Sequence, residues 1–163
     1  MRRLLIVWHS MTGGARAMAE AAADAARGQE GVETILRRAD ATDAGDVLAA
    51  DAYLFVTPEN LAAIAGLMKD FFDRCYYPAL GRIEGRAYAQ MVCAGSDGTS
   101  AARQIERIAK GWRLRAVADP LILLTHAQTP EAIAAPKIIA PADLDRCRDL
   151  GAAIAGGLAL GIY

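Results

Sequence analysis

The chain has 163 residues, of which 54% are hydrophobic and 23% are charged, and its formal net charge is −1. This length suits a single domain with a buried core, and the balanced charge disfavours nucleic acid and anionic membranes as partners. No apolar run approaches the roughly 18 residues of a membrane span, and the apolar run near the start is too short for a signal peptide. We therefore expect a cytoplasmic protein.

Three cysteines, Cys75, Cys93 and Cys147, lie far apart in the chain, without a CxxC pair or a Cys/His cluster. An odd number of isolated cysteines disfavours a disulfide framework and a zinc site. Each cysteine lies within an apolar pattern, which is typical of a small buried side chain. We expect no metal site.

The chain begins with a continuous apolar run over residues 4–8, typical of a strand that is buried on both faces. An alanine-rich segment over residues 14–27 then predicts a helix. Gly28 and Gly31 predict its end.

The same alternation continues to the end of the chain. It predicts strands over residues 32–36, 52–56, 87–94 and 116–124, and helices over residues 64–76, 100–112 and 143–160. The polar connection over residues 39–50 is expected to hold a short helix from Asp43. Pro58 predicts the end of the third strand, and Pro120 suits a fifth strand at the sheet edge.

The loop over residues 125–141 is longer than usual and contains three prolines. Thr129, as N-cap, and Pro130, at the first helical position, predict one short helical turn within it. This loop is an ordinary long loop, a lid beside a ligand, or part of a dimer interface; the residues leave these alternatives open.

Strands that alternate with helices indicate one α/β domain over residues 1–163, with a five-stranded parallel sheet between two helix layers. Ligands bind such sheets beyond the carboxyl ends of the strands, where the strand order reverses. For the order 2-1-3-4-5 this point lies between the first and third strands. Three loops rich in small and polar residues meet there, at residues 9–15, 57–64 and 95–100.

The first of these loops combines the hydroxyls of Ser10 and Thr12 with Gly13 and Gly14, just before a predicted helix. Free N–H groups and the helix dipole favour a phosphate at this place, and the glycines permit close approach. An ordinary capped turn is the alternative interpretation. The Gly-x-x-x-x-Gly-Lys pattern of a Walker loop is absent.

The segment Ser10-Met11-Thr12-Gly13-Gly14-Ala15 resembles the Ser/Thr-x-Thr-Gly-x-Thr phosphate loop of flavodoxins and NAD(P)H-dependent FMN reductases. Residues 57–60 and 66–74 resemble the segment of those families that begins Thr-Pro-Glu-Tyr. Residues 94–98 lie where the families keep a third flavin loop. The resemblance spans most of the chain and implies a flavodoxin-like three-layer sandwich in the order 2-1-3-4-5.

The resemblance also implies FMN as the cofactor and NAD(P)H as an electron donor. The residues that it assigns to FMN are Ser10, Met11, Thr12, Gly13, Gly14 and Ala15 at the phosphate, Pro58, Glu59, Asn60 and Leu61 along one side of the isoalloxazine, and Gly95, Ser96, Asp97 and Gly98 from the third loop.

This sequence departs from the family pattern in two ways. Ala15 replaces the last threonine of the phosphate loop, which removes one hydroxyl ligand. The second and third loops lack the aromatic residue that often stacks on the flavin of electron-carrying flavodoxins. These departures imply one of two alternatives: the flavin is bound more loosely and is accessible to a substrate, or no flavin is bound.

Two histidines stand beside the predicted site. His126 follows the fifth strand and is the one candidate for a catalytic side chain, in contact with substrate or nicotinamide. His9 flanks the phosphate loop, where a structural role is favoured, and the neighbouring Trp8 is predicted to be core. No Ser/His/Asp or Cys/His arrangement for nucleophilic catalysis stands out.

Three functions compete. The first is an NAD(P)H-dependent oxidoreductase that passes electrons to a flavin or quinone acceptor. The absence of stacking aromatic residues favours it, because a substrate must reach the face of the flavin. The second is a flavodoxin-type electron carrier, which the net charge of −1 disfavours because such carriers tend to be strongly acidic. The third is a flavodoxin-like domain that binds another phosphate ligand, or none. Small-molecule donor and acceptor are the expected partners, and a homodimer or tetramer is the alternative to a monomer.

Overall fold

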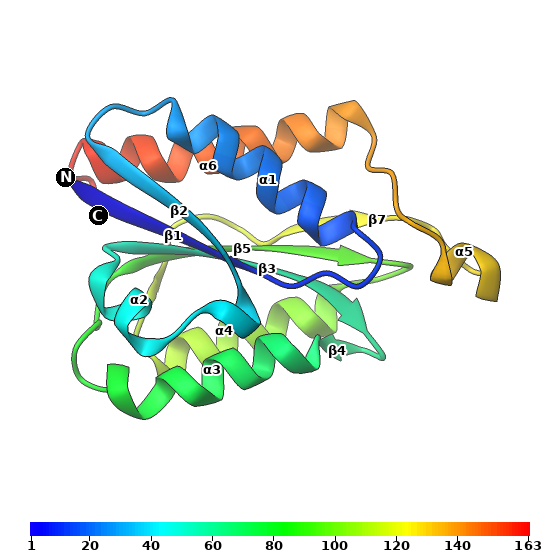
Figure 1. The fold of residues 1–163 in the computed structure, drawn as a ribbon, viewed down its shortest axis with the longest axis horizontal. Helices are drawn as coiled ribbons and strands as arrows, with labels where there is room; N and C mark the ends of the chain where they lie inside the picture. The colour runs from blue at the N-terminus through cyan, green and yellow to red at the C-terminus, as the bar shows by residue number, and fades with distance from the viewer.

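A sheet of seven strands forms the middle layer of the computed structural model, which describes residues 1–163 (Figure 1). The strands are β1 (Arg2–Trp8), β2 (Val32–Arg38), β3 (Ala52–Asn60), β4 (Ala63–Ile64), β5 (Ala87–Ala94), β6 (Arg115–Ala116) and β7 (Leu121–Leu124). All pairings are parallel except that of β4 with β3.

Side chains of the central strands alternate between two separate apolar cores. In β1, Leu4 and Ile6 belong to one core, and Leu5 and Val7 belong to the other. All four side chains are fully buried. Burial on both faces explains why this strand appears in the sequence as a continuous apolar run.

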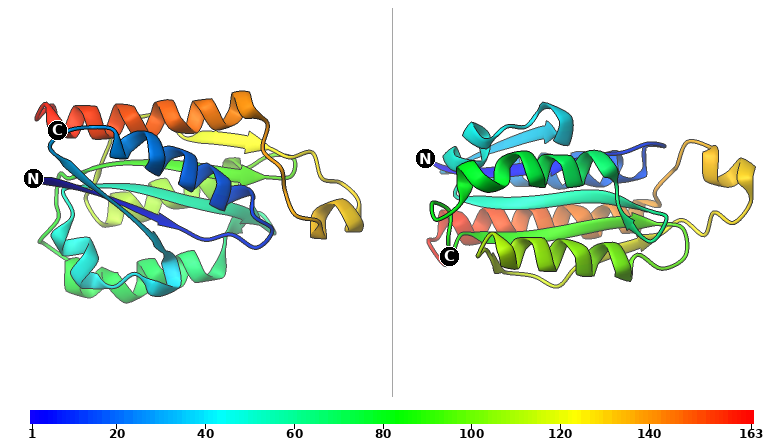
Figure 2. Two further views of the ribbon diagram at one scale, coloured as in Figure 1. Left: turned by 45° about the horizontal axis from the view of Figure 1, so that its top comes forward. Right: turned by 90° about the horizontal axis from the view of Figure 1, so that it is seen from below.

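Helices cover both faces of the sheet (Figures 1 and 2). The helices of the chain are α1 (Gly14–Arg27), the 3₁₀ helix η1 (Ala39–Ala41), α2 (Ala44–Ala49), α3 (Gly66–Ala79), α4 (Thr99–Gly111), α5 (Pro130–Ala134) and α6 (Pro141–Ala159). Helices α1 and α6 lie on one face, and α2, α3 and α4 lie on the other. The small helix α5 projects beyond the carboxyl edge of the sheet (Figure 1).

The strand order β2-β1-β3-β5 followed by β6 and β7 confirms the predicted parallel order, with β5 as the fourth strand. The predicted fifth strand over residues 116–124 is in fact two short strands. Both pair with β5, but residues 117–120 between them leave the ladder. Pro120 has no N–H to donate, so the ladder breaks beside it.

The prediction that Pro58 ends the third strand is wrong, because β3 continues to Asn60. β1 pairs with β3 only as far as Val56, so Pro58 lies beyond the part of β3 that has a parallel neighbour on both sides. A missing N–H is tolerated there. The extra residues then fold back as a hairpin onto β4, through the pairs Glu59 with Ile64 and Asn60 with Ala63.

Most helix predictions are confirmed within two or three residues. The range of α1 is as predicted, and Asp43 caps α2 through a reciprocal capping box with Asp46. Thr129 caps α5 as predicted, because its hydroxyl accepts a hydrogen bond from the N–H of Ala132. Ile64, expected at the start of α3, instead belongs to β4.

The cysteines are free and buried, as predicted. Burial raises the pKa of Cys75 to about 11 and that of Cys147 to about 12. Both thiols therefore stay protonated near neutral pH and act as small core side chains. No helix combines the length and the apolar character that crossing a membrane requires.

Helices α1 and α6 approach each other closely through small residues. A Cβ atom on Gly151 of α6 would meet the backbone carbonyl of Ala22 in α1, inside van der Waals contact. Ala22 itself is fully buried. The alanine-rich composition of α1 is therefore a packing requirement as well as a helix-forming one.

We predict that Gly151→Ala lowers the free energy of unfolding by about 1–3 kcal/mol, because the added methyl group forces the two helices apart. Gly156→Ala, on the same helix, is the matched control. Its Cβ would meet only the side chain of Gln29, at 3.6 Å, and alanine is the better helix former by about 0.5–1 kcal/mol. Urea denaturation measures both; equal effects of the two variants would contradict the packing argument.

Candidate functional site

A pocket of about 500 Å³ opens where β1, β3 and β5 end. This edge carries the arrowheads of the strands in Figure 1. We call it the loop pocket. It is lined by Ser10, Met11, Thr12, Gly14, Ala15, Pro58, Glu59, Asn60, Leu61, Cys93, Ala94, Gly95, Thr125, Ala127, Ile133 and Lys137. Its size lies in the range of small-molecule and cofactor sites.

The phosphate loop, residues 10–15, presents unpaired backbone donors to this pocket. The Ser10 hydroxyl accepts the N–H of Gly13 at 2.9 Å, and Gly13 adopts a left-handed φ of 98°. The chain then enters α1 with Gly14 and Ala15 buried, and their N–H groups have no protein acceptor. N–H groups at the start of a helix have no partner within the helix and are free to bind a ligand, and the helix dipole favours a negatively charged one.

Gly14 is required by the close approach of β5. A Cβ atom at this position would lie 2.6 Å from the sulfur of Cys93. Cys93 forms part of the pocket floor, where burial raises its pKa and the positive charge of Lys137 opposes that rise. The absence of a side chain at Gly14 therefore lets the start of α1 lie directly on the floor of the pocket.

Glu59 connects the second loop to the third. Its carboxylate accepts the N–H of Gly98 with one oxygen and the N–H of Ala101 with the other, both at 3.0 Å. These N–H groups belong to the N-terminus of α4, where a carboxylate is stabilised by the helix dipole. Glu59 therefore fixes the third loop against the β3–β4 hairpin, whose tip at Leu61 and Ala62 is left-handed.

Residues 125–140, which we call the wall segment, close the opposite side of the pocket. The N–H groups of Thr125 and His126 donate to the carbonyls of Ala94 and Gly95 at 2.8 and 2.9 Å. The N–H of Lys137 donates to the carbonyl of Thr12 at 2.8 Å. The segment therefore bridges the third loop and the phosphate loop, which favours the prediction of a structure beside the ligand over an unattached long loop.

Most residues predicted for the site come together in the loop pocket. Those that line it are Ser10, Met11, Thr12, Gly14, Ala15, Pro58, Glu59, Asn60, Leu61 and Gly95. Gly13, Ser96, Asp97 and Gly98 do not line it. The N–H of Gly13 is already donated to Ser10, and Gly98 is buried against the side chain of Ile122.

His126 does not line the loop pocket, although its neighbours Thr125 and Ala127 do. Its side chain is exposed and its backbone is left-handed, with φ of 56°. A role for this imidazole in catalysis remains a prediction. His9 is buried behind the phosphate loop, and burial lowers its pKa more than nearby Asp40 raises it, which agrees with a neutral structural histidine.

Sequence reasoning did not find six lining residues: Cys93, Ala94, Thr125, Ala127, Ile133 and Lys137. Cys93 was assigned to the strand alone, and Ala94 was placed at the start of the third loop without being assigned to FMN. The other four belong to the wall segment, whose path across the pocket leaves no periodic pattern. The one available signal is Lys137 itself, the only charged residue in the apolar stretch over residues 132–140.

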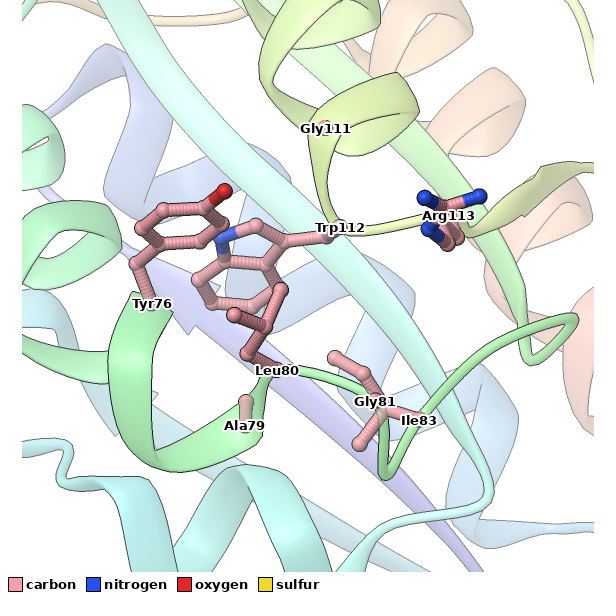
Figure 3. Close-up of a pocket in the computed structure, with 8 residues that line it drawn as sticks. All are labelled: Tyr76, Ala79, Leu80, Gly81, Ile83, Gly111, Trp112 and Arg113. Carbon is pink, nitrogen blue, oxygen red and sulfur yellow. The ribbon is translucent and has the colours of Figure 1, made fainter.

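Two other hollows differ from the loop pocket. One of about 10 Å³ lies under the C-terminal ends of α3 and α4, at the opposite edge of the sheet, and Figure 3 shows Leu80, Ile83 and Trp112 lining it. It is too small for a cofactor. The other, which we call the α4 groove, has a volume of about 540 Å³ and lies between β4 and α4 with Lys69, Arg103 and Arg107 on its walls.

The sequence pattern described as NADPH-dependent FMN reductase matches residues 38–129 of this chain. The chain belongs to that family. The matched range includes the second and third loops of the pocket and the strands that carry them.

Individual relatives agree with this assignment. The chain is 33% identical over 98 residues to a flavodoxin of Aquifex aeolicus, covering 60% of this chain and 53% of the relative. It is 31% identical over 94 aligned positions to an NAD(P)H dehydrogenase (quinone) of Acidithiobacillus ferrooxidans, covering 45% of this chain and 47% of the relative. The chain thus matches about half the length of these curated relatives.

Solved structures show the same fold. An archaeal flavodoxin superposes with a TM-score of 0.75 at 17% identity, covering 94% of this chain and 96% of the other. A flavodoxin, WrbA-like protein from Agrobacterium tumefaciens superposes with a TM-score of 0.70 at 20% identity, covering 99% of both chains. The predicted flavodoxin-like fold is confirmed.

FMN is the cofactor that the family and its relatives imply, and the loop pocket fits it. The unpaired N–H groups of Gly14 and Ala15 would supply donors for its phosphate. Small and apolar residues elsewhere on the wall leave room for a flat ring system. The missing hydroxyl at Ala15 does not remove these backbone donors, which are independent of the side chain.

We predict that Glu59→Ala lowers the free energy of unfolding by about 1–2 kcal/mol, because two N–H groups at the start of α4 lose their charged acceptor. Glu59→Gln keeps one acceptor oxygen and is expected to lose less. The control is Asn60→Ala, an exposed neighbour whose side chain makes no hydrogen bond. Urea denaturation distinguishes them, and an Asn60→Ala loss as large as that of Glu59→Ala would refute the capping role.

Proposed function

We propose that this protein is an FMN-dependent oxidoreductase that takes hydride from NAD(P)H and passes electrons to a flavin or quinone acceptor. The observation that carries the proposal is the pair of unpaired N–H groups of Gly14 and Ala15, two residues that line the loop pocket. They support a bound phosphate in a chain of the FMN reductase family.

The chain's own residues bind and orient the cofactor. The phosphate loop would hold the phosphate, and Asn60 and Leu61 of the hairpin and Gly95 of the third loop, which also line the pocket, would contact the ring. Bound FMN supplies the hydride and electron chemistry. No aromatic side chain lines the loop pocket, so a donor or acceptor has access to the ring face.

The α4 groove supports a phosphorylated donor. It lies across the β3–β4 hairpin from the loop pocket, because Asn60 and Leu61 line the pocket and Ala62 and Ala63 line the groove. Arg103 makes no ion pair in the structure, nor does Arg107, its neighbour one turn along α4. Their positive charge is complementary to the phosphates of NAD(P)H.

We predict that Gly13→Ala weakens FMN binding about five- to thirtyfold, because a left-handed alanine costs about 1–2 kcal/mol and the free loop relaxes away from its binding geometry. Gly31→Ala is the matched control. Gly31 is also left-handed, with φ of 81°, and also has open space around its Cβ position, but it lies before β2 at the opposite edge. Quenching of FMN fluorescence measures both affinities; equal losses in the two variants would argue against this loop as the phosphate site.

Steady-state turnover separates the enzyme from an electron carrier. We expect the FMN-loaded protein to oxidise NADPH or NADH continuously when a quinone or free flavin is added. A protein that retains FMN but shows no turnover with either donor would be a carrier of the flavodoxin type. If the protein binds no FMN, the flavodoxin-like fold still holds, but the oxidoreductase function is refuted and the pocket would have to bind another phosphate ligand.

A further inference from the structure

The backbone of the wall segment holds Lys137 beside the phosphate loop. The hydrogen bond from its N–H to the Thr12 carbonyl is 2.8 Å long. The Cβ of Lys137 lies 3.4 Å from the position that a Cβ on Gly14 would take. The lysine side chain therefore starts next to the first residue of α1, where the unpaired N–H groups lie.

Lys137 is the only basic side chain on the lining of the loop pocket, and Glu59 is the only acidic one. Both carboxylate oxygens of Glu59 are occupied by N–H groups of α4. Lys137 makes no salt bridge; its ammonium donates instead to the carbonyls of Ile133 and Ala135, at 2.8 and 2.6 Å. A half-buried positive charge thus stands at the pocket without a negative partner.

The present partners of Lys137 are weak competitors for a phosphate. They are carbonyls at the end of α5, a helix of five residues that buries none of its side chains. Hydrogen bonds between an ammonium and a phosphate are charge-assisted and roughly twice as strong as neutral ones. The four-carbon stem of lysine rotates freely enough to exchange one set of partners for the other.

We propose that Lys137 is a phosphate-recognition residue, which leaves the carbonyls of α5 and binds the FMN phosphate held by the N–H groups of Gly14 and Ala15. This inference rests on the proposed function. It assigns a cationic phosphate contact to the wall segment, about 120 residues beyond the phosphate loop in the chain. It also accounts for Ala15, because a charge from the wall replaces the hydroxyl that this position lacks.

The test compares FMN with riboflavin, which has the same ring system and no phosphate. Dissociation constants for both flavins are measured by fluorescence quenching with the wild-type protein, Lys137→Met, Lys137→Arg and Lys69→Met. Lys69 is a half-buried lysine on the α4 groove, paired with Asp73, and serves as the control for loss of one positive charge.

We expect Lys137→Met to weaken FMN binding about tenfold or more while riboflavin affinity stays unchanged. The Lys137→Arg variant should retain most of the FMN affinity, and Lys69→Met should retain all of it. The affinity of Lys137→Met for FMN should also depend less on salt concentration, because one charge pair is missing.

Equal losses for FMN and riboflavin would overturn the proposal, because they would show that Lys137 only holds the wall segment in place. Unchanged FMN affinity in Lys137→Met would overturn it as well. Both results leave the FMN-dependent function intact. Failure of the wild-type protein to bind either flavin would instead refute the proposed function, and the role of Lys137 with it.

Discussion

A parallel sheet that is buried on both faces confines chemistry to the ends of its strands. Every side chain along the middle of β1, β3 and β5 faces one of two cores, so a polar group there needs a partner inside the protein. Gln90 shows the consequence: it is buried in β5, and its amide N–H donates to the carbonyl of Ala102 in α4, while its Oε1 has no partner. Exposed polar chemistry begins only where the strands stop, and parallel strands all stop at one edge.

The two cores differ in kind, and the difference shapes the site. The core under α3 and α4 contains a cluster of aromatic rings, with Phe55 in contact with Phe72 and Trp112. The core under α1 and α6 has no aromatic residue among its buried members and consists mainly of alanine and aliphatic side chains. Small residues let α1 lie close to the sheet, and that closeness brings its first N–H groups down to the pocket floor beside Cys93.

Patterns local in the chain predicted most of this architecture. Continuous apolar runs located the buried strands, alanine content located α1, and the series Ser10 to Ala15 located a loop that lines the pocket. Long-range contacts could not be predicted in this way. Glu59 was assigned to the flavin by resemblance, and its two bonds to the start of α4 depend on a partner about 40 residues away.

The same limit explains the other differences. A proline usually ends a strand, but β3 continues past Pro58 because β1 pairs with it only as far as Val56. Only the register of the two strands shows this. The contribution of Lys137 depends on the path of the wall segment across the pocket, which is fixed by hydrogen bonds to Ala94, Gly95 and Thr12. Such contacts join residues that are far apart in the chain, so no periodic pattern in the sequence reveals them.

The broken strand at the edge of the sheet also bears on how copies of this chain meet. A long, uninterrupted edge strand is a template for another chain, and proteins resist this with short strands, prolines and charges. Here β7 has four residues and follows Pro120, while β2 at the other edge ends in Arg37 and Arg38. Neither edge favours extension of the sheet from one molecule into the next, so self-association that preserves the fold has to use helices and loops.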